Sequence, residues 1–247
     1  MTYWVLKILL TPLLRFFYRV RVEGLEHVPP EGAAILASNH LSFCDSLFLP
    51  LVLRRRVTFV AKAEYFEDPK TAWFFRAVGQ IPIKRGDGSA ALRALASASE
   101  VLQLGELFGI YPEGTRSPDG RVYKGHTGVA RLTLDNRVPV LACAMVGTRE
   151  AQPIGQALPR LFMPITIRIS HPLSFEQYYE RAKDPRVLRE ITDSIMFELR
   201  ELSGQEYVHT YARRTRAEDA VAAEEVRLVS LATMEASVRR PVAAHAG

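Results

Sequence analysis

The chain has 247 residues, of which 48% are apolar and 24% are charged, so a wholly disordered protein is excluded and one large α/β domain with a buried core is possible. A net charge of +5 and a pI of about 9.3 predict anionic partners. Nucleic acid is not favoured, because the basic residues are scattered and no helix-turn-helix, zinc-finger or RNA-binding pattern occurs. Anionic lipid surfaces and phosphorylated substrates remain.

The two cysteines, Cys44 and Cys143, have no spacing typical of a metal site or a disulfide framework. The sequence therefore predicts a reducing, cytoplasmic compartment. It predicts no resident metal.

Residues 1–20 are strongly apolar, but charged residues and Pro12 interrupt them, so they fall short of the roughly 20 apolar residues of a membrane span. They also lack the basic start and the cleavage site of a signal peptide. On a helix, one narrow side is polar: Lys7, Thr11, Arg15 and Arg19. The opposite side is broad and apolar: Trp4, Leu6, Leu9, Leu10, Leu13 and Phe17. This pattern predicts a helix in an anionic membrane interface, or alternatively a helix docked onto the protein's own core and kinked at Pro12.

Predicted strands and helices alternate through most of the chain. Strands are predicted at residues 20–24, 33–38, 56–61, 80–84, 107–111, 138–147 and 165–170. Helices are predicted at residues 46–53, 69–79, 89–103, 128–136 and 185–202. This order predicts an α/β fold with a mostly central mixed sheet flanked by helices, in which the alternating polarity of 165–170 is typical of a peripheral strand.

Three segments follow from the changes in composition. Residues 1–20 are predicted to be the amphipathic, membrane-associating helix, and residues 21–211 the α/β domain, whose last helix begins at Asp184-Pro185 and ends at Ser203-Gly204. Residues 212–247 are rich in Ala and charge and are predicted to be helical or disordered.

The stretch ASNHLSFCDS places His40 and Asp45 five positions apart, which is a rotation of about 140° on a helix. The two side chains could not meet if both were helical. Ser42 and Asp45 form an S-x-x-D capping box, which predicts Ser42 as the N-cap and Asp45 at position N3, where its side chain leans back toward His40. Asp45 could then accept from one ring nitrogen and leave the other free to take a proton. The alternative is a helix cap beside an incidental histidine.

Neither cysteine nor serine is favoured as a nucleophile. Cys44 has apolar residues near it, Phe43 and Leu47, and is predicted to be a small buried residue. No G-x-S-x-G elbow occurs in the sequence.

Two further polar loops follow predicted strands, where ligands collect in open α/β sheets. The loop YPEGTRS exposes backbone around Gly114 and presents Arg116, whose planar fork suits a phosphate. Further cations could come from Lys84, Arg85 and Lys124, although any one of them could be a solvated surface charge. Glu113 is out of place beside a phosphate and is predicted to hold a basic neighbour or to accept from a substrate hydroxyl.

Four motifs in this order closely resemble those of the glycerolipid acyltransferases, the 1-acyl-glycerol-3-phosphate acyltransferase family. They are N-H-x-x-x-x-D from Asn39 to Asp45, GQIPIKR from Gly79 to Arg85, YPEGTRS with Tyr111 for the usual Phe, and VPVLACAMVG around Pro139. The resemblance covers residues 20–175 and makes residues 21–211 an acyltransferase domain.

The resemblance implies transfer of a fatty acyl group from acyl-CoA or acyl carrier protein, as co-substrate, to the free hydroxyl of 1-acyl-glycerol-3-phosphate (lysophosphatidic acid). The product would be phosphatidic acid, made for phospholipid biosynthesis without an acyl-enzyme and without a cofactor. It implies that His40 is the general base and that Asp45 orients it. It also implies a binding site for the glycerol phosphate: Arg85, Glu113, Gly114, Thr115 and Arg116. The expected location is the cytoplasmic face of the membrane, as a peripheral or monotopic protein.

Other hypotheses stay open. The acceptor could be another lysophospholipid, glycerol 3-phosphate or a glycolipid hydroxyl, and a non-catalytic lipid-binding protein could use the same basic and apolar surfaces. We expect a backbone N–H of the second or third loop to stabilise the oxyanion. His126 is not part of the family pattern, and it could be a surface residue or a substrate contact.

Overall fold

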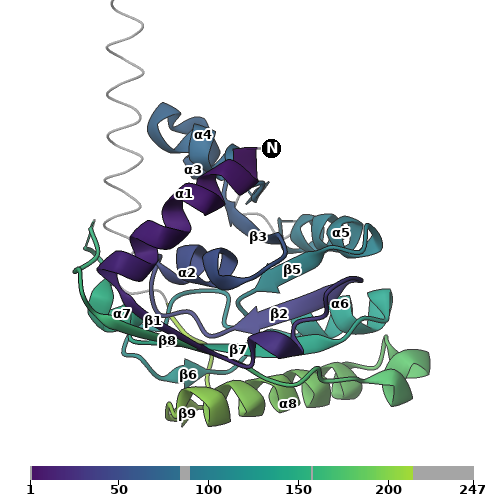
Figure 1. Cartoon of the computed structure of the whole chain (residues 1–247). Helices are drawn as coiled ribbons and strands as arrows, with labels where there is room; N and C mark the ends of the chain where they lie inside the picture. The colour runs from purple at the N-terminus through teal and green to yellow at the C-terminus, as the bar shows by residue number, and fades with distance from the viewer. Residues whose placement is uncertain (1, 84–89, 157, 214–247) are drawn as a thin grey trace, which may run out of the picture. The chain divides into compact units, whose positions relative to one another are not determined.

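A seven-stranded sheet lies at the centre of the computed structural model, which describes residues 2–83, 90–156 and 158–213. The strand order is β1-β8-β7-β2-β5-β3-β4 (Figure 1). The strands are β1 (Arg19–Glu23), β2 (Ala34–Ser38), β3 (Val57–Lys62), β4 (Ile81–Ile83), β5 (Leu107–Ile110), β7 (Val140–Val146) and β8 (Pro164–Ile169). Neighbouring strands run parallel except β7 and β8, which are antiparallel. The predicted mixed sheet is confirmed.

Helices cover both faces of this sheet. They are α1 (Thr2–Phe17), α2 (Asp45–Val52), α3 (Glu64–Glu67), α4 (Pro69–Ala77), α5 (Ala90–Gln103), α6 (Gly128–Asn136), α7 (Thr148–Ala151) and α8 (Pro185–Ser203), with 3₁₀ turns η1 (Leu25–His27) and η2 (Glu176–Arg181). Figure 1 shows α1 and α2 above the sheet and α8 below it. Helices α5, α6 and α8 contribute to one core cluster, while α2 contributes to the other.

The central strand β2 shows how the sequence divides its side chains between these two cores. Side chains of a strand alternate between faces. Ala34 and Leu36 belong to the cluster under α2, whereas Ile35 and Ala37 belong to the cluster on the side of α5, α6 and α8. All four are fully buried, which explains why this strand reads as a continuous apolar run.

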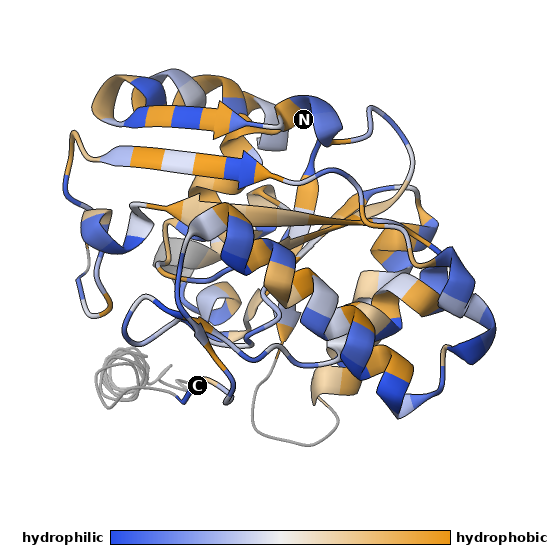
Figure 2. Cartoon of the chain, turned by 90° about the horizontal axis from the view of Figure 1, so that it is seen from below, coloured by the Kyte–Doolittle hydropathy of each residue, from blue (hydrophilic) through white to orange (hydrophobic). Residues whose placement is uncertain are grey.

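The outer strands have a different pattern. In β8 the residues alternate between buried and more exposed, and Figure 2 shows the corresponding alternation of hydrophobic and hydrophilic bands in β1 and β8. Strand β8 lies next to the edge strand β1, so residues 165–170 are peripheral as predicted.

Helix α8 begins and ends at the residues that the sequence indicated. The Asp184 carboxylate accepts from the backbone N–H of Arg186 at 2.9 Å, Pro185 is the first helical residue, and Gly204 ends the helix with φ of 70°. The buried apolar residues recur at helical spacing: Val187, Leu188, Ile191, Ile195, Met196 and Leu199.

A second, two-stranded sheet has no clear signal in the sequence. Strand β6 (Val122–Tyr123) pairs in parallel with β9 (Tyr207–Val208), which follows α8. Two-residue strands are too short to show a periodicity. This pairing brings the end of the described chain against the loop that follows β5.

Half of the predicted polar stripe, Lys7 and Thr11, turns toward the protein, whereas Arg15 and Arg19 are exposed as predicted. The Lys7 ammonium donates to the carbonyls of Pro50, at 3.1 Å, and of Leu53, and Thr11 donates to the carbonyl of Leu51 at 3.4 Å. These carbonyls belong to the last turn and end of α2, whose C-terminal oxygens lack partners within the helix. Burial lowers the pKa of Lys7. Lys7 and Thr11, which were predicted to contact lipid headgroups, therefore stabilise the C-terminal end of α2.

The exposed side of α1 is instead apolar. It consists of Trp4, Val5, Ile8, Leu9, Leu13 and Phe16. Within the described ranges, no helix is both long and apolar enough to cross a membrane. The predicted tail, residues 212–247, lies almost entirely outside the described residues.

Candidate active site

The first and third motifs meet because they follow neighbouring parallel strands. Ala37 of β2 pairs in register with Ile110 of β5, so residues 39–45 and 111–117 leave the same edge of the sheet. Strand β4 also runs parallel to its neighbour β3. Lys84 and Arg85 come directly after β4 and lie outside the described residues, so their predicted role stays a prediction.

His40 and Asp45 meet as predicted. The Nδ1 atom of His40 lies 3.0 Å from Oδ2 of Asp45, which also accepts from the backbone N–H groups of Leu41 and Ser42 at 2.7 and 2.8 Å. Because an ionised carboxylate only accepts, this contact places the proton of a neutral imidazole on Nδ1 and leaves Nε2 as the basic atom. The Asp45 side chain is fully buried, whereas that of His40 is 17% exposed.

The helix that carries Asp45 begins later than the capping box predicted. Helix α2 starts at Asp45, and the residues from Ser42 onward form a tight turn in which the Asp45 N–H donates to the Ser42 carbonyl at 3.2 Å. The Ser42 hydroxyl accepts from Cys44 N–H and donates to the Gln152 carbonyl, so it does not cap Asp45. Of the two hydrogen bonds of the predicted capping box, only the one from Ser42 N–H to the Asp45 carboxylate is present.

The third motif holds the main chain of His40 on both sides. Its Glu113 carboxylate accepts from the backbone N–H of His40 at 3.3 Å, and the backbone N–H of Ser117 donates to the carbonyl of His40 at 2.6 Å. Ser117 is fully buried and its hydroxyl donates to the carbonyl of Arg121 at 2.7 Å. Sequence reasoning gave Ser117 no role, although it is the last residue of the quoted motif.

Glu113 differs from the role predicted for it. Glu113 is only 1% exposed, and its second carboxylate oxygen accepts from the backbone N–H of Tyr123 at 2.9 Å. The side chain thus joins the His40 loop to β6 and presents no open face to a substrate phosphate. Burial raises the pKa of Glu113 to about 7. Burial and backbone donors explain this residue better than a contact with substrate or with a basic neighbour.

Asn39, the residue before His40, also holds the His40 loop in place through hydrogen bonds. Its amide accepts from Met145 N–H at 2.7 Å and donates to the Met145 carbonyl at 3.0 Å, so it continues the pairing of β2 with β7 beyond the end of β2. It also donates to the Gln205 side chain at 2.7 Å. A buried asparagine with this many partners fixes the chain where it turns toward His40.

Cys44 is buried, as predicted, and its thiol donates to Oε1 of Gln152 at 3.1 Å. Burial is the largest cause that raises its pKa to about 11. A thiol with that pKa is neutral at pH 7, which argues against a thiolate nucleophile.

The other predicted binding residues lie around the exposed turn of the third motif. Gly114 has φ of 73°, and a side chain there would meet the ring of His126 at about 3.2 Å. That ring stacks on Tyr211 at 4.5 Å, and the Lys124 ammonium lies 5.5 Å from the centre of the same tyrosine ring. The structure therefore places Lys124 and His126 beside the turn that contains Thr115 and Arg116, which are both partly exposed.

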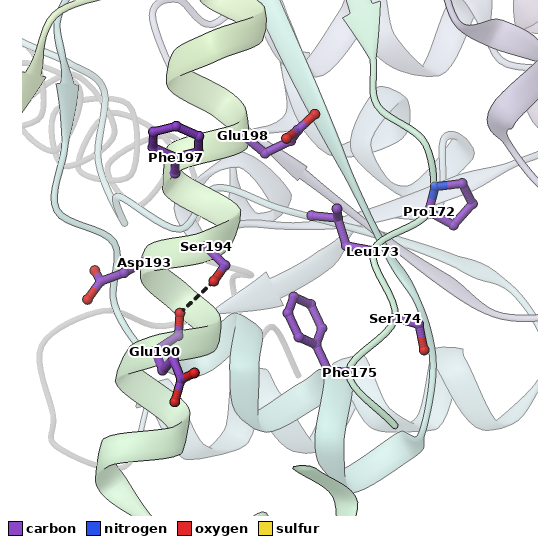
Figure 3. Close-up of a pocket in the computed structure, with 9 residues that line it drawn as sticks. All are labelled: Pro172, Leu173, Ser174, Phe175, Glu190, Asp193, Ser194, Phe197 and Glu198. Atoms are coloured by element: carbon purple, nitrogen blue, oxygen red, sulfur yellow. Dashed lines mark hydrogen bonds between the residues drawn. The ribbon is translucent and has the colours of Figure 1, made fainter. Parts of the chain in front are cut away.

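A separate hollow of about 830 Å³ lies between α8 and the chain that follows β8 (Figure 3). Its lining includes three carboxylates, Glu190, Asp193 and Glu198, beside exposed Phe197. No residue of the four motifs lines it, and its charge is unfavourable for a phosphate. In the described part of the chain, no group of three metal-ligating side chains lies close enough together to hold an ion.

A family model described as Acyltransferase matches residues 19–146, just over half of the chain, and contains the His40–Asp45 pair and the whole third motif. The chain belongs to the acyltransferase family. The chain is 33% identical over 140 residues to the chloroplastic 1-acyl-sn-glycerol-3-phosphate acyltransferase LPAT1 of Arabidopsis thaliana. The match covers 56% of this chain and 39% of LPAT1, so the chain spans about two fifths of that relative's length.

Two other similarities cover more of the chain. An uncharacterized protein of Mycobacterium tuberculosis is 27% identical over an alignment that covers 74% of this chain and 62% of the relative. The crystal structure of PlsC, the 1-acyl-sn-glycerophosphate acyltransferase of Thermotoga maritima, superposes with a TM-score of 0.59 at 26% identity and covers 81% of this chain and 82% of PlsC. The family predicted from the four motifs is thus confirmed.

Proposed function

We propose that this acyltransferase moves a fatty acyl group from an acyl thioester, acyl-CoA or acyl carrier protein, to the free hydroxyl of 1-acyl-glycerol-3-phosphate. The product is phosphatidic acid, for phospholipid biosynthesis. The observation that carries the proposal is the bond from His40 Nδ1 to the buried Asp45 carboxylate, in a loop held on both sides by the third motif. The names of LPAT1 and PlsC support the same acceptor.

The chemistry follows from the protonation state of His40. Its Nε2 takes the proton of the acceptor hydroxyl while the hydroxyl oxygen attacks the thioester carbonyl carbon. The resulting tetrahedral intermediate expels the thiolate, and the imidazolium returns its proton to that sulfur, so the enzyme ends in its starting state. Asp45 favours the imidazolium, and its second carboxylate oxygen, Oδ1, has no hydrogen-bond partner among the described residues that would weaken this effect.

The phosphate of the acceptor is assigned to the exposed turn of the third motif. Arg116 is the residue there with the geometry to bind a phosphate through two N–H groups, and Lys124 lies nearby through the Tyr211 stack. Arg85 and Lys84 complete this assignment on sequence grounds. Glu113 supports the site by accepting hydrogen bonds from the backbone N–H groups of His40 and Tyr123.

We also propose that α1 docks on the cytoplasmic face of an anionic membrane. Its exposed apolar side continues into the loop before β8, where Leu158, Leu161 and Phe162 are at least half exposed. The Phe162 N–H donates to the carbonyl of Phe17 at 2.7 Å, and the rings of these two residues lie 6.0 Å apart. Exposed Arg15 and Arg160 border this surface, a combination typical of interfacial segments. Two free cysteines agree with a reducing compartment.

Purified protein, presented with lyso-acceptors and acyl donors in vesicles, tests the proposal directly. Mass spectrometry of the products should show phosphatidic acid from 1-acyl-glycerol-3-phosphate, with release of free thiol in equal amount. Glycerol 3-phosphate, lysophospholipids with other headgroups and a glycolipid serve as competing acceptors. Preferential acylation of one of these would refute the proposed acceptor, and absence of thiol release with every pair would refute the enzymatic proposal.

A further inference from the structure

The imidazole of His40 lies flat against a tyrosine ring. The ring centres of His40 and Tyr111 are 3.8 Å apart and their planes differ by 11°. Tyr111 is the first residue of the third motif, at the position where the related motif has Phe. The bond to Asp45 holds one edge of the imidazole, whereas the stack covers one of its faces. Rotation of the ring about its side-chain bonds would have to break both contacts.

The ring of Tyr111 has a second stacking partner, Phe59. The ring of Phe59, in β3, stacks on the ring of Tyr111, with ring centres 5.3 Å apart and planes 24° apart. Phe59 pairs in register with Gly109 of β5, and a Cβ atom at Gly109 would lie 2.2 Å from the Phe59 ring. Glycine at that position therefore makes the room in which Phe59 supports Tyr111.

The hydroxyl of Tyr111 ties the stack to the helix that carries Asp45. It lies 2.8 Å from the hydroxyl of Ser46, the residue after Asp45. Burial, followed by the charge of Asp45, raises the pKa of Tyr111 well above its ordinary value, so the phenol stays neutral at physiological pH. Two consecutive residues of α2 thus hold the two stacked rings, one ring each.

We propose that Tyr111 is a positioning residue for acyl transfer, which fixes the plane of the His40 ring and stabilises the imidazolium that forms when Nε2 takes a proton. The inference rests on the proposed function of His40. The face of an aromatic ring attracts a cation, and the electron-rich ring of Tyr111 lies within the distance at which this attraction is strong. The described titratable groups bonded to His40 are Asp45 and Glu113, and both are carboxyl groups that assist in the same direction when ionised.

Four variants separate the ring from the hydroxyl. Tyr111→Leu removes the stack, Tyr111→Phe keeps it, Ser46→Ala removes the partner of the hydroxyl, and the double variant Tyr111→Phe/Ser46→Ala completes a cycle. We expect Tyr111→Leu to lower kcat about 3- to 30-fold, the factor that a cation–ring contact supplies, while the KM of the acceptor stays within about two-fold. We expect each hydroxyl variant to lower kcat by less than Tyr111→Leu, and the double variant to be no worse than the poorer single one.

The pH profile supplies a readout that a merely structural role would not change. Without the ring face the protonated form of the base is less stable, so the acid-side fall of kcat/KM should move to lower pH in Tyr111→Leu and stay in place in Tyr111→Phe. Tyr111→Met, which is unbranched and apolar, replaces Tyr111→Leu if thermal unfolding shows that the latter is not folded.

His40→Ala, measured alongside, distinguishes the failure of this inference from the failure of the proposed function. If His40→Ala is inactive while Tyr111→Leu has the kcat and the pH profile of the wild type, the positioning role is refuted and the base remains. Equal losses in Tyr111→Phe and Tyr111→Leu, with no movement of the acid limb, would also refute it. An active His40→Ala would overturn both proposals.

Discussion

Ser117 donates its backbone N–H to the backbone carbonyl of His40 at 2.6 Å, so the end of the third motif is bonded directly to the centre of the first. Glu113, four residues earlier, accepts from the N–H of the same histidine. The two motifs therefore act as one structural unit, and substitutions in the third motif can lower kcat without touching the substrate. Contacts of this kind favour a site in which His40 is already oriented before substrate binds.

Removal of the two members of the proposed pair should have different consequences for folding. We expect His40→Ala to lower kcat by about 10²- to 10⁴-fold, the usual contribution of a general base, with little change in thermal stability. We expect Asp45→Ala to be inactive and also destabilised, because the buried N–H groups of Leu41 and Ser42 lose their acceptor at about 1–3 kcal/mol each.

Thiol release and calorimetric Tm on both variants check this contrast. His171→Ala is a matched control, since His171 is exposed and lies outside the four motifs. Equal destabilisation of His40→Ala and Asp45→Ala would contradict the bonding pattern around the Asp45 carboxylate.

The raised pKa of Glu113 predicts a pH dependence of stability. In the folded protein this carboxyl holds its proton up to a pKa of about 7, whereas its ordinary value is 4.5. Between these values the folded state binds more protons than the unfolded state, so the free energy of unfolding falls as pH rises. Glu113→Gln lacks this titration.

Urea denaturation of wild type and Glu113→Gln at several pH values measures the effect, because contributions from all other groups cancel in the difference. The stability of the wild type relative to the variant should fall between pH of about 4.5 and about 7 and be constant above about 8. A difference that does not vary with pH would contradict the assignment.

Much of this site could be predicted from the sequence because its residues are close in the chain or at strand ends. His40 and Asp45 are five positions apart, and parallel strands bring Arg116 to the same edge of the sheet. The predicted N-cap of α2 was wrong by two residues, Ser42 in place of Cys44, since both a capping box and a tight turn satisfy Ser42 and Asp45 with similar local bonds.

Other features depend on partners that are distant in the chain. Lys7 belongs to a stripe that looks solvated until the carbonyl end of α2, more than forty residues later, is placed beside it. Glu113 has a polar side chain but is buried, because the backbone N–H groups of two other segments donate to its carboxylate. A single sequence contains no signal for such pairings, which arise only when the sheet is assembled.

Arg116 provides a test of the phosphate assignment. If its guanidinium binds the phosphate of the acceptor, Arg116→Ala should raise the KM of the acceptor about tenfold or more and leave the KM of the thioester within about two-fold. Arg116→Lys should recover only part of the loss, because a lysine cannot form two parallel bonds. Steady-state kinetics with each substrate varied in turn distinguishes the two. Equal effects on both KM values would argue that Arg116 shapes the whole site.

Phe162 allows the membrane surface to be tested without confusing lost binding with lost folding. It has φ of 63°, a left-handed conformation that is strained for a bulky residue, and its side chain is 61% exposed. Phe162→Gly should therefore raise the free energy of unfolding while it weakens binding to anionic vesicles, by about tenfold or more if the ring is buried in lipid. Leu104→Ser, also highly exposed but outside this surface, should leave vesicle binding unchanged. Cosedimentation with vesicles and urea denaturation measure the two effects, and unchanged binding of a stabilised Phe162→Gly would exclude the loop before β8 from the interface.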